Sequence, residues 1–311
     1  MTPSYLSRLL LLSTGSFFLV LMIVGALVAW IAPSAIRRAS AMRPQRAARW
    51  LLTLRLLPTA LSAMIVAVLC VPGYLRFEPH IPREQAGMAC LLAAILGVFF
   101  CTLAMCRAFS ALLRSSLFLR RSGGRESLVD GETVWIVAHG AGLALAGIVR
   151  PRLLISEGAM AGLSSDQLAV ALRHEHAHRS SRDNLKRLLI QLAPAVFPAL
   201  RTLEQAWVKY AEWAADDRAT EGDADRSAAL AAALVRVARV QSGIAMPALV
   251  TSLVAADEDL AQRVDRLLDT RLVSEPDRRF ETIAFASAAL LIAVLAMNLR
   301  IVHLLLEYLL D

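Results

Sequence analysis

A His-Glu-x-x-His pattern, formed by His174, Glu175 and His178, lies near the middle of the sequence. Residues four apart on a helix lie one above the other, so the two histidines can present their imidazoles to one metal ion while Glu175 projects from a neighbouring angle. A zinc ion held by two histidines and one carboxylate keeps a fourth position for water and lowers the pKa of that water. Because the adjacent glutamate can then take the proton, the pattern predicts the chemistry of amide hydrolysis.

The third protein ligand is expected on a second helix, where the sequence Glu212-Trp213-Ala214-Ala215-Asp216 places two acids one turn apart. Glu212 can complete the ligand set, and Asp216 can orient a ligand histidine from behind. Asp217 competes with Asp216 for that role. Asp183, five residues past the last motif histidine, is a further candidate for orienting a ligand.

The other histidines are expected to be structural. His176 sits about 200° around the helix from His174, so it faces away from the metal. His80, His139 and His303 have no partner at metal-binding spacing. The two motif histidines are therefore the only ones assigned to the metal.

The elements that must position these residues can be outlined from the sequence. Ser164 and Gln167 fit a capping box at the start of the motif helix, flanked by a hydrophobic staple of Leu163 and Leu168. Val134–Val137 and Arg152–Ser156, with an apolar stretch at 143–149 between them, are expected to form strands of a small sheet. Residues 115–131, with two adjacent glycines and several charges, are expected to be a linker leading away from a membrane.

The segment after the motif helix is apolar but interrupted. Residues 188–200 contain Pro194 and Pro198, which predicts a broken segment packed on the domain or touching the membrane surface. The alternative is a further membrane span, which would place Glu212 across the membrane from His174. Residues 203–241 are Ala-rich and are expected to be largely helical.

The composition places this site in a membrane protein. Of the 311 residues, 57% are hydrophobic, more than the roughly 45–50% of soluble globular proteins. The excess is concentrated in four blocks, at about 9–32, 51–72, 86–106 and 282–299. Each is close to the length of about 20 apolar residues that spans a bilayer core, so four transmembrane helices are expected.

The distribution of arginines predicts the orientation of these spans. A run of arginines without acids separates the first two blocks, and a second run follows the third block, whereas the loop between the second and third blocks is nearly balanced in charge. By the positive-inside rule, both arginine-rich connections face the cytoplasm, which places both termini outside. The arginines that give the net charge of +7 are therefore expected to flank the membrane and to contact its lipids. No direct nucleic-acid partner is expected.

Two alternatives concern the membrane-spanning blocks. The first block could be a secretory signal, but it is longer than the usual apolar region of a signal peptide and is followed by arginines. The four cysteines lie in or at the edges of the blocks, where they are expected to be small packing residues. Cys70 and Cys90 flank one short loop, so a disulfide between them is the competing interpretation.

The chain resembles the BlaR/MecR-type antirepressor membrane metallopeptidases, also called metallopeptidase family 56. The resemblance rests on residues 174–178 continuing to Arg182-Asp183, on residues 150–156 (Arg-Pro-Arg-Leu-Leu-Ile-Ser) and on Glu212 through Asp216. It also covers the order of three spans, a zinc domain and a closing span. It implies a gluzincin-like fold, in which the active-site helix lies beneath a small sheet whose edge strand can hold an extended substrate.

The chain departs from that family after the fourth span. Members that sense beta-lactams carry a penicillin-binding domain there, whereas this sequence stops at Asp311. Antibiotic sensing is therefore not expected, and a separate sensor protein is expected instead. The HtpX/Ste24-like membrane quality-control proteases share the metal-binding elements, but their spans are arranged differently. A non-proteolytic signalling scaffold is a third alternative, against which an intact Glu175 argues.

The expected architecture is a mainly α membrane protein whose chain divides into three regions. Residues 1–111 hold three transmembrane helices, residues 112–280 form a cytoplasmic α+β gluzincin-like zinc peptidase domain, and residues 281–311 hold the fourth helix and a short outer tail. The expected function is a zinc endopeptidase of the inner, cytoplasmic membrane that cleaves a cytoplasmic protein, by the resemblance a transcriptional repressor. Glu175 acts as the general base, and either Tyr210 or Arg218 could stabilise the oxyanion.

Overall fold

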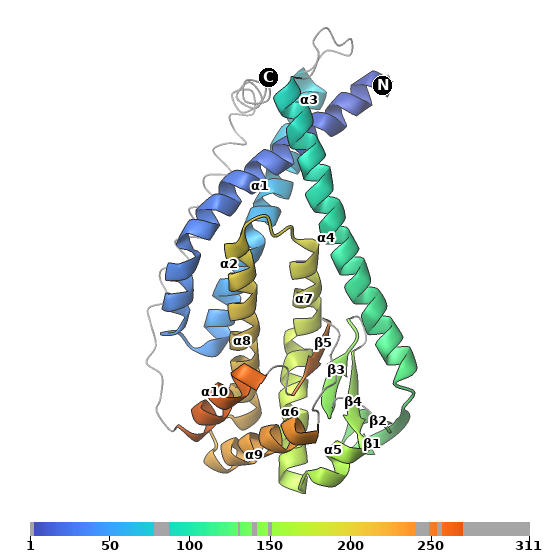
Figure 1. The fold of residues 1–311 in the computed structure, drawn as a ribbon, viewed down its shortest axis with the longest axis vertical. Helices are drawn as coiled ribbons and strands as arrows, with labels where there is room; N and C mark the ends of the chain where they lie inside the picture. The colour runs from blue at the N-terminus through green and yellow to red at the C-terminus, as the bar shows by residue number, and fades with distance from the viewer. Residues whose placement is uncertain are drawn as a thin grey trace.

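Three long apolar helices stand together at one end of the mostly helical fold (Figure 1). The computed structural model describes residues 3–77, 87–129, 131–138, 142–148, 151–240, 249–253 and 257–269. Helix α1 (Pro3–Ala39) is followed by α2 (Pro44–Ile65), which continues through a π-helical turn η1 (Val66–Cys70) into α3 (Val71–Phe77). Helix α4 (Met88–Arg121) completes the group. The predicted fourth span, at 282–299, lies outside the described residues.

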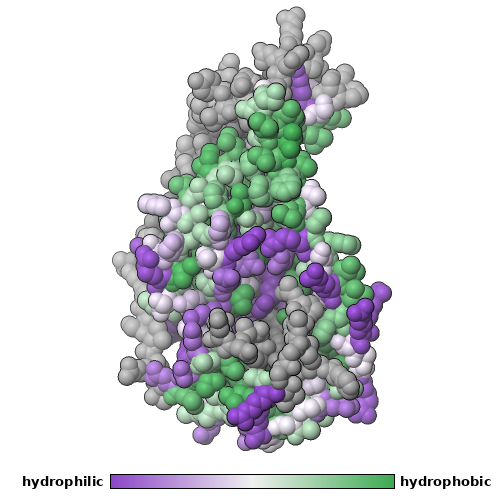
Figure 2. Space-filling view, in the orientation of Figure 1, coloured by the Kyte–Doolittle hydropathy of each residue, from purple (hydrophilic) through white to green (hydrophobic). Residues whose placement is uncertain are grey.

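These three helices are long and apolar enough to cross a membrane. Their outer faces carry large exposed apolar side chains, including Leu92, Phe99 and Phe109 on α4, and Figure 2 shows a hydrophobic surface over this end of the molecule. Helices α1 and α4 approach closely because Gly97 has no side chain: a Cβ atom there would lie 2.9 Å from the backbone oxygen of Thr14. These helices therefore support the membrane protein that the composition predicts.

The sheet has five strands in the order β1-β2-β4-β3-β5. Its strands are β1 (Arg125–Val129), β2 (Glu132–Val137), β3 (Leu143–Ala146), β4 (Arg152–Ser156) and β5 (Val250–Ser252). Strands β2 and β4 are parallel, and the other pairs are antiparallel. The strands predicted at 134–137 and 152–156 are confirmed.

The linker predicted at 115–131 is wrong. Helix α4 continues to Arg121, and strand β1 begins at Arg125, which leaves only three residues between them. The helix extends because residues 107–121 contain no glycine or proline, and the strand forms because β1 pairs in register with β2. The third span is thus joined directly to the sheet.

The described residues after strand β4 also form six helices. They are α5 (Glu157–Gly162), α6 (Ser165–Ser181), α7 (Asp183–Leu192), α8 (Pro198–Thr220), α9 (Ala224–Val240) and α10 (Asp257–Leu268). One apolar core lies between the sheet and α6, α9 and α10, and includes Ile155, Leu172 and Leu234. A second core, which we call the junction core, packs α8 against α1 and α2 through Leu51, Leu203 and Trp207.

Helix α6, which carries the metal-binding motif, begins and ends at defined residues. The predicted capping box is confirmed: the Gln167 backbone N–H donates to Ser164 Oγ over 3.4 Å, and the Ser164 N–H donates to Gln167 Oε1 over 3.2 Å. At the other end Arg182 has φ 55° and ψ 42°, which stops α6 and starts α7 in one residue. Asp183 is thereby placed beside the last turn of α6.

Helices α7 and α8 form a hairpin beside the membrane-spanning helices (Figure 1). Helix α7 ends before Pro194 and α8 begins at Pro198, so the predicted broken segment is confirmed. At the tip of the hairpin the Phe197 ring reaches α1, where a Cβ on Gly25 would lie 3.0 Å from it. The buried guanidinium of Arg55, from α2, donates to the carbonyls of Ile190 and Ala193 over 3.2 and 2.9 Å.

Candidate metal centre

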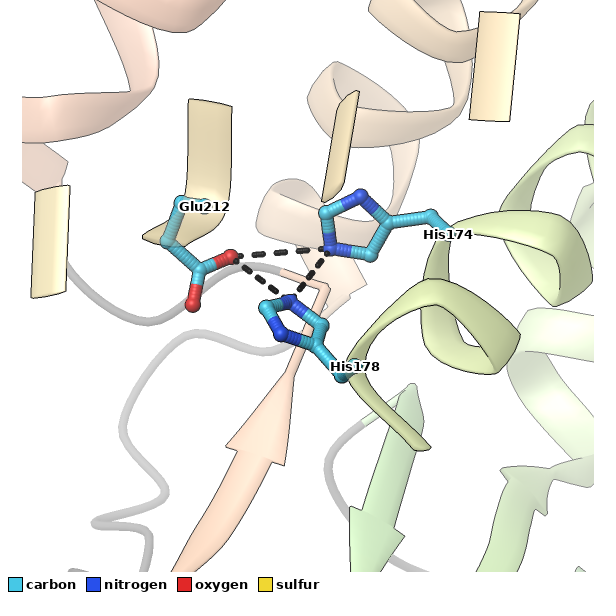
Figure 3. A group of neighbouring side chains, drawn as sticks. All are labelled: His174, His178 and Glu212. Carbon is cyan, nitrogen blue, oxygen red and sulfur yellow. Dashed lines mark hydrogen bonds and ion pairs between the residues drawn. The ribbon is translucent and has the colours of Figure 1, made fainter. Parts of the chain in front are cut away.

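Three side chains from α6 and α8 converge on one point (Figure 3). His174 and His178, one turn apart on α6, place their Nε2 atoms 3.1 Å from each other. Glu212, from α8, places Oε2 3.5 Å from His174 Nε2 and 3.3 Å from His178 Nε2. The contact between His174 and Glu212 also excludes the alternative in which a further span separates them.

The chemistry of these three atoms suits a metal ion. All three side chains are buried, and Glu212 Oε2 has no hydrogen-bond donor although it is shielded from water. A buried acceptor without a hydrogen bond is costly unless a cation or donor satisfies it. Together the two imidazoles and the carboxylate form a group that could hold a metal ion.

Each ligand histidine has a carboxylate behind it. Asp216, one turn after Glu212 on α8, lies with Oδ1 2.9 Å from His174 Nδ1. Asp183, the first residue of α7, lies with Oδ2 2.8 Å from His178 Nδ1. A carboxylate at Nδ1 fixes the tautomer and ring orientation, so that Nε2 is directed at the metal. The structure therefore brings all the acids proposed as ligand or orienting residues, except Asp217, to the two histidines.

Glu175 lies in the same buried space but takes no part in holding the others. Its side chain is fully buried, and neither carboxylate oxygen has a hydrogen-bond partner among the described residues. Burial raises the pKa of Glu175 above its ordinary value, against the opposing pull of His174 and His178. Glu175 is thus a carboxylate that can exchange a proton nearer to neutral pH than a solvated glutamate.

Arg263, from α10, is a member of the site that sequence reasoning missed. Its Nε and Nη2 donate to the two carboxylate oxygens of Asp216 over 2.9 and 2.6 Å, and Nη1 donates to the carbonyl of Leu253 over 2.7 Å. Nη1 also lies 3.5 Å from Glu212 Oε2. No spacing rule connects residues 47 apart, and an arginine in a short charged helix looks like a surface residue in the sequence.

Two basic residues of α7 complete the surroundings. Lys186 Nζ donates to Asp183 Oδ1 over 2.7 Å, and Arg187 Nη2 donates to Glu212 Oε1 over 3.4 Å. Both lie within one helical turn of Asp183, so their spacing from Asp183 in the sequence could have predicted that they lie near the site. They leave Glu212 Oε2 as the oxygen directed at the histidines.

The charges of the site shift its pKa values in opposite directions. Burial alone would lower the pKa of His178, but the carboxylates of Glu212 and Asp183 outweigh it and raise this pKa to about 10. Burial would raise the pKa of Asp216, but the Arg263 guanidinium and His174 hold it at about 2. The pKa of Glu212 likewise lies well below its ordinary value, despite burial, because of His178 and His174.

Several other predicted positions lie apart from this group. His176 is exposed and pairs with Glu132 at 3.2 Å, so the prediction that it faces away is confirmed. Asp217 pairs with Arg266 rather than with a ligand histidine. Arg218 donates to the carbonyl of Ala177, and Tyr210 belongs to the junction core. His80, His139 and His303 lie outside the described residues.

Comparison with known proteins adds no assignment. No protein-family model matches the sequence, and no curated protein matches it significantly. What the site can do therefore has to be inferred from its own residues: a buried group that could bind a metal ion, two carboxylates that orient its imidazoles, and a further carboxylate without a partner.

Proposed function

We propose that this chain is a membrane-integrated zinc metallopeptidase. The observation that carries the proposal is the buried carboxylate of Glu175, which lies beside a group able to hold a metal ion and has no hydrogen-bond partner among the described residues. A site that only stabilised the fold would gain nothing from a second, unpaired carboxylate, because burying one is costly. A hydrolytic site requires it as a base.

Zinc is the metal that best suits the three ligands. Imidazole nitrogens are borderline ligands, which harder cations such as Mg²⁺ and Ca²⁺ do not prefer, and zinc also accepts a carboxylate beside them. In a tetrahedral site with ligand distances of about 2.0–2.1 Å, neighbouring ligand atoms lie about 3.3 Å apart. The separations here are 3.1, 3.3 and 3.5 Å, so the three side chains are already spaced for such an ion, with a fourth position left for a reactant.

The residues then have distinct roles. A zinc ion bound here supplies a Lewis acid that makes water nucleophilic near neutral pH. Glu175 accepts the proton of the attacking water and passes it to the amine that leaves. Asp216 and Asp183 keep the imidazoles of His174 and His178 turned toward the metal, and Arg263 holds Asp216 in place.

A groove beside His178 offers room for a peptide. The cavity has a volume of about 690 Å³ and is bordered by the β3–β4 connection and by the α6–α7 junction. Its apolar wall includes Leu145, Ile148 and Leu185, and Arg179 and Arg182 lie at its edge. An extended chain lying there would pass directly beside the metal-binding group.

The cellular role follows from the resemblance to the BlaR/MecR-type antirepressor peptidases. On that basis the substrate is a cytoplasmic protein, such as a transcriptional repressor. The arginine-rich ends of the spans favour the cytoplasmic side of the inner membrane for the metal centre.

The test is a Glu175→Gln variant, with Glu157→Gln as its matched control. Glu157 is an exposed residue at the start of α5, so the same chemical change there leaves the site alone. In cells, peptide termini that depend on the wild-type protein should disappear with Glu175→Gln and remain with Glu157→Gln. Removal of a general base typically costs about 10²–10⁴ in rate.

Metal content separates catalysis from folding in the same experiment. The purified Glu175→Gln protein should hold the same zinc per chain as the wild type, because Glu175 is not a ligand. Normal cleavage by this variant would show that Glu175 is not the general base. A wild-type protein that binds zinc but generates no new termini would favour the signalling scaffold over a peptidase.

A further inference from the structure

A second cavity lies where the membrane-spanning helices meet the metal-binding domain. It has a volume of about 250 Å³ and is enclosed by the first turns of α2, the α6–α7 junction and α8. These elements come from three distant parts of the sequence. The cavity is separate from the groove beside the metal and is not needed for the proposed hydrolysis.

Three of the side chains around this cavity are basic, and the others are mostly apolar or small. Arg49 comes from α2, Lys186 from α7 and Arg218 from α8, and the only acid among the lining residues is Asp183. Asp183 is itself occupied by His178 and by Lys186. The cavity therefore carries an excess of positive charge, with the guanidinium groups of Arg49 and Arg218 on exposed residues at its edge.

The position of the cavity relative to the apolar helices is specific. Arg49 lies two residues before the apolar block that begins at Leu51, and therefore at the level where the bilayer core ends. The inner wall is apolar, with Leu52 and the buried ring of Trp207. A ligand with an anionic head and an apolar tail meets matching surfaces there.

We propose that this cavity binds the phosphate group of an anionic phospholipid. Basic pockets between membrane helices are suited to such headgroups, since each arginine can donate two parallel hydrogen bonds to phosphate oxygens. The acyl chains would run along the apolar surface of α2, and the headgroup would lie between Arg49, Lys186 and Arg218. The alternative source of the same chemistry is a free phosphate ester from solution.

The cavity shares one residue with the metal centre. Asp183 orients His178 through Oδ2 and accepts from Lys186 through Oδ1. A phosphate that competes for Lys186 would therefore change what Asp183 contacts. The lipid site is thereby connected to a metal ligand through two side chains.

The experiment measures thermal unfolding of the full chain in detergent with added short-chain lipids. Dihexanoyl phosphatidylglycerol should raise Tm by about 3 °C at a concentration near ten times its Kd, whereas dihexanoyl phosphatidylcholine should not. The shift should be lost in Arg49→Ala and in Arg218→Ala. It should persist in Arg114→Ala, an exposed arginine of α4 that does not border the cavity.

Three outcomes would overturn the proposal. They are an equal shift in Arg49→Ala and the wild type, an equal shift from phosphatidylcholine, and an equal shift from glycerol phosphate. The last would assign the cavity to a free phosphate ester. Because each variant is compared with and without lipid, a variant of lower basal stability remains informative, and no step depends on proteolytic activity.

Discussion

The two ligand histidines are held by different kinds of support. Behind His174 stands Asp216, which a bidentate arginine from α10 fixes on both oxygens. Behind His178 stands Asp183, whose other oxygen accepts only from Lys186, a flexible and partly exposed side chain. The α8 side of the site is therefore rigid, and the α7 side has more freedom to adjust.

Glu212 is expected to be required for metal binding. Glu212→Ala removes one of three ligand atoms, so metal affinity should fall by more than the roughly 10–100-fold that loss of an orienting partner costs. The measurement is competition with a chelator of known affinity. Asp217→Ala, on the same helix, should leave the affinity close to wild type because Asp217 pairs with Arg266. The opposite pattern would transfer the ligand role to Asp217.

Metal binding is expected to release a proton. The pKa of His178 in the metal-free site is raised to about 10, so this imidazole is charged at pH 7, whereas a ligand imidazole must be neutral. Affinity should therefore rise about tenfold per pH unit between pH 7 and pH 8. Calorimetry in buffers of different ionisation enthalpy should count about one proton released. No dependence on the buffer would show that His178 is already neutral.

At the residue scale the sequence supports some assignments better than others. His174, Glu175 and His178 follow from spacing on one helix, since a helix brings every fourth residue to one face. Glu212 required the assumption that a second helix folds back, and the structure places it beside them. Arg263 had no local pattern, because its contact with Asp216 depends entirely on how α10 packs.

At the scale of elements, the α7–α8 hairpin connects the spans to the site. The first residue of α7 orients His178, and the far end of α7 is capped by Arg55 from α2. Helix α8 starts at the same tip and carries Glu204, whose Oε2 lies 3.8 Å from Arg55 Nε, and then Glu212. A displacement of α2 would therefore move both arms of the hairpin.

Arg55→Ala is expected to destabilise the protein strongly. It removes a buried guanidinium that donates to the carbonyls of Ile190 and Ala193 and lies 3.8 Å from the partly exposed carboxylate of Glu204. Leaving a buried acceptor without its hydrogen bond costs about 1–3 kcal/mol. Thermal unfolding in detergent should show this loss, whereas Arg120→Ala, at the exposed end of α4, should behave like the wild type. Equal stability of the two variants would mean that Arg55 does not hold the hairpin.

Prediction of the elements succeeded where a local pattern existed. The capping box defined the start of α6, and the apolar runs defined β2 and β4. Strand β5 has only three residues, too few to show alternation, and forms because β3 offers it a partner. Strand β1 was not predicted, because a charged sequence flanked by glycines is typical of a linker as well as of an exposed edge strand.

At the scale of the whole molecule, three apolar helices and one domain form a continuous structure. The junction core joins α8 to α1 and α2, so the metal centre is anchored to the membrane-spanning part rather than tethered by a flexible segment. The presence of the spans could be predicted from hydropathy alone. The mode of attachment could not, because it depends on contacts between residues more than a hundred positions apart.

The orientation in the membrane can be tested with reporters inserted at Gly131. This glycine lies in the turn between β1 and β2, and no atom lies within 4 Å of where its Cβ would be. The arginine-rich ends of the spans predict that this side is cytoplasmic. A fluorescent reporter at Gly131 should be bright and a phosphatase reporter inactive, while the N-terminus should be accessible from outside. An active phosphatase reporter would show that the topology is the reverse of the predicted one and would rule out a cytoplasmic substrate.

The junction core also links the metal centre to the insertion of the first two helices. The first half of α8 packs against α1 and α2, and its second half carries Glu212 toward His174 and His178. The site is therefore complete only when α1 and α2 pack against α8 and when α10 brings Arg263 to Asp216. We expect a chain whose first two helices are not inserted to lack an organised metal site, so that any activity of the site would depend on membrane insertion.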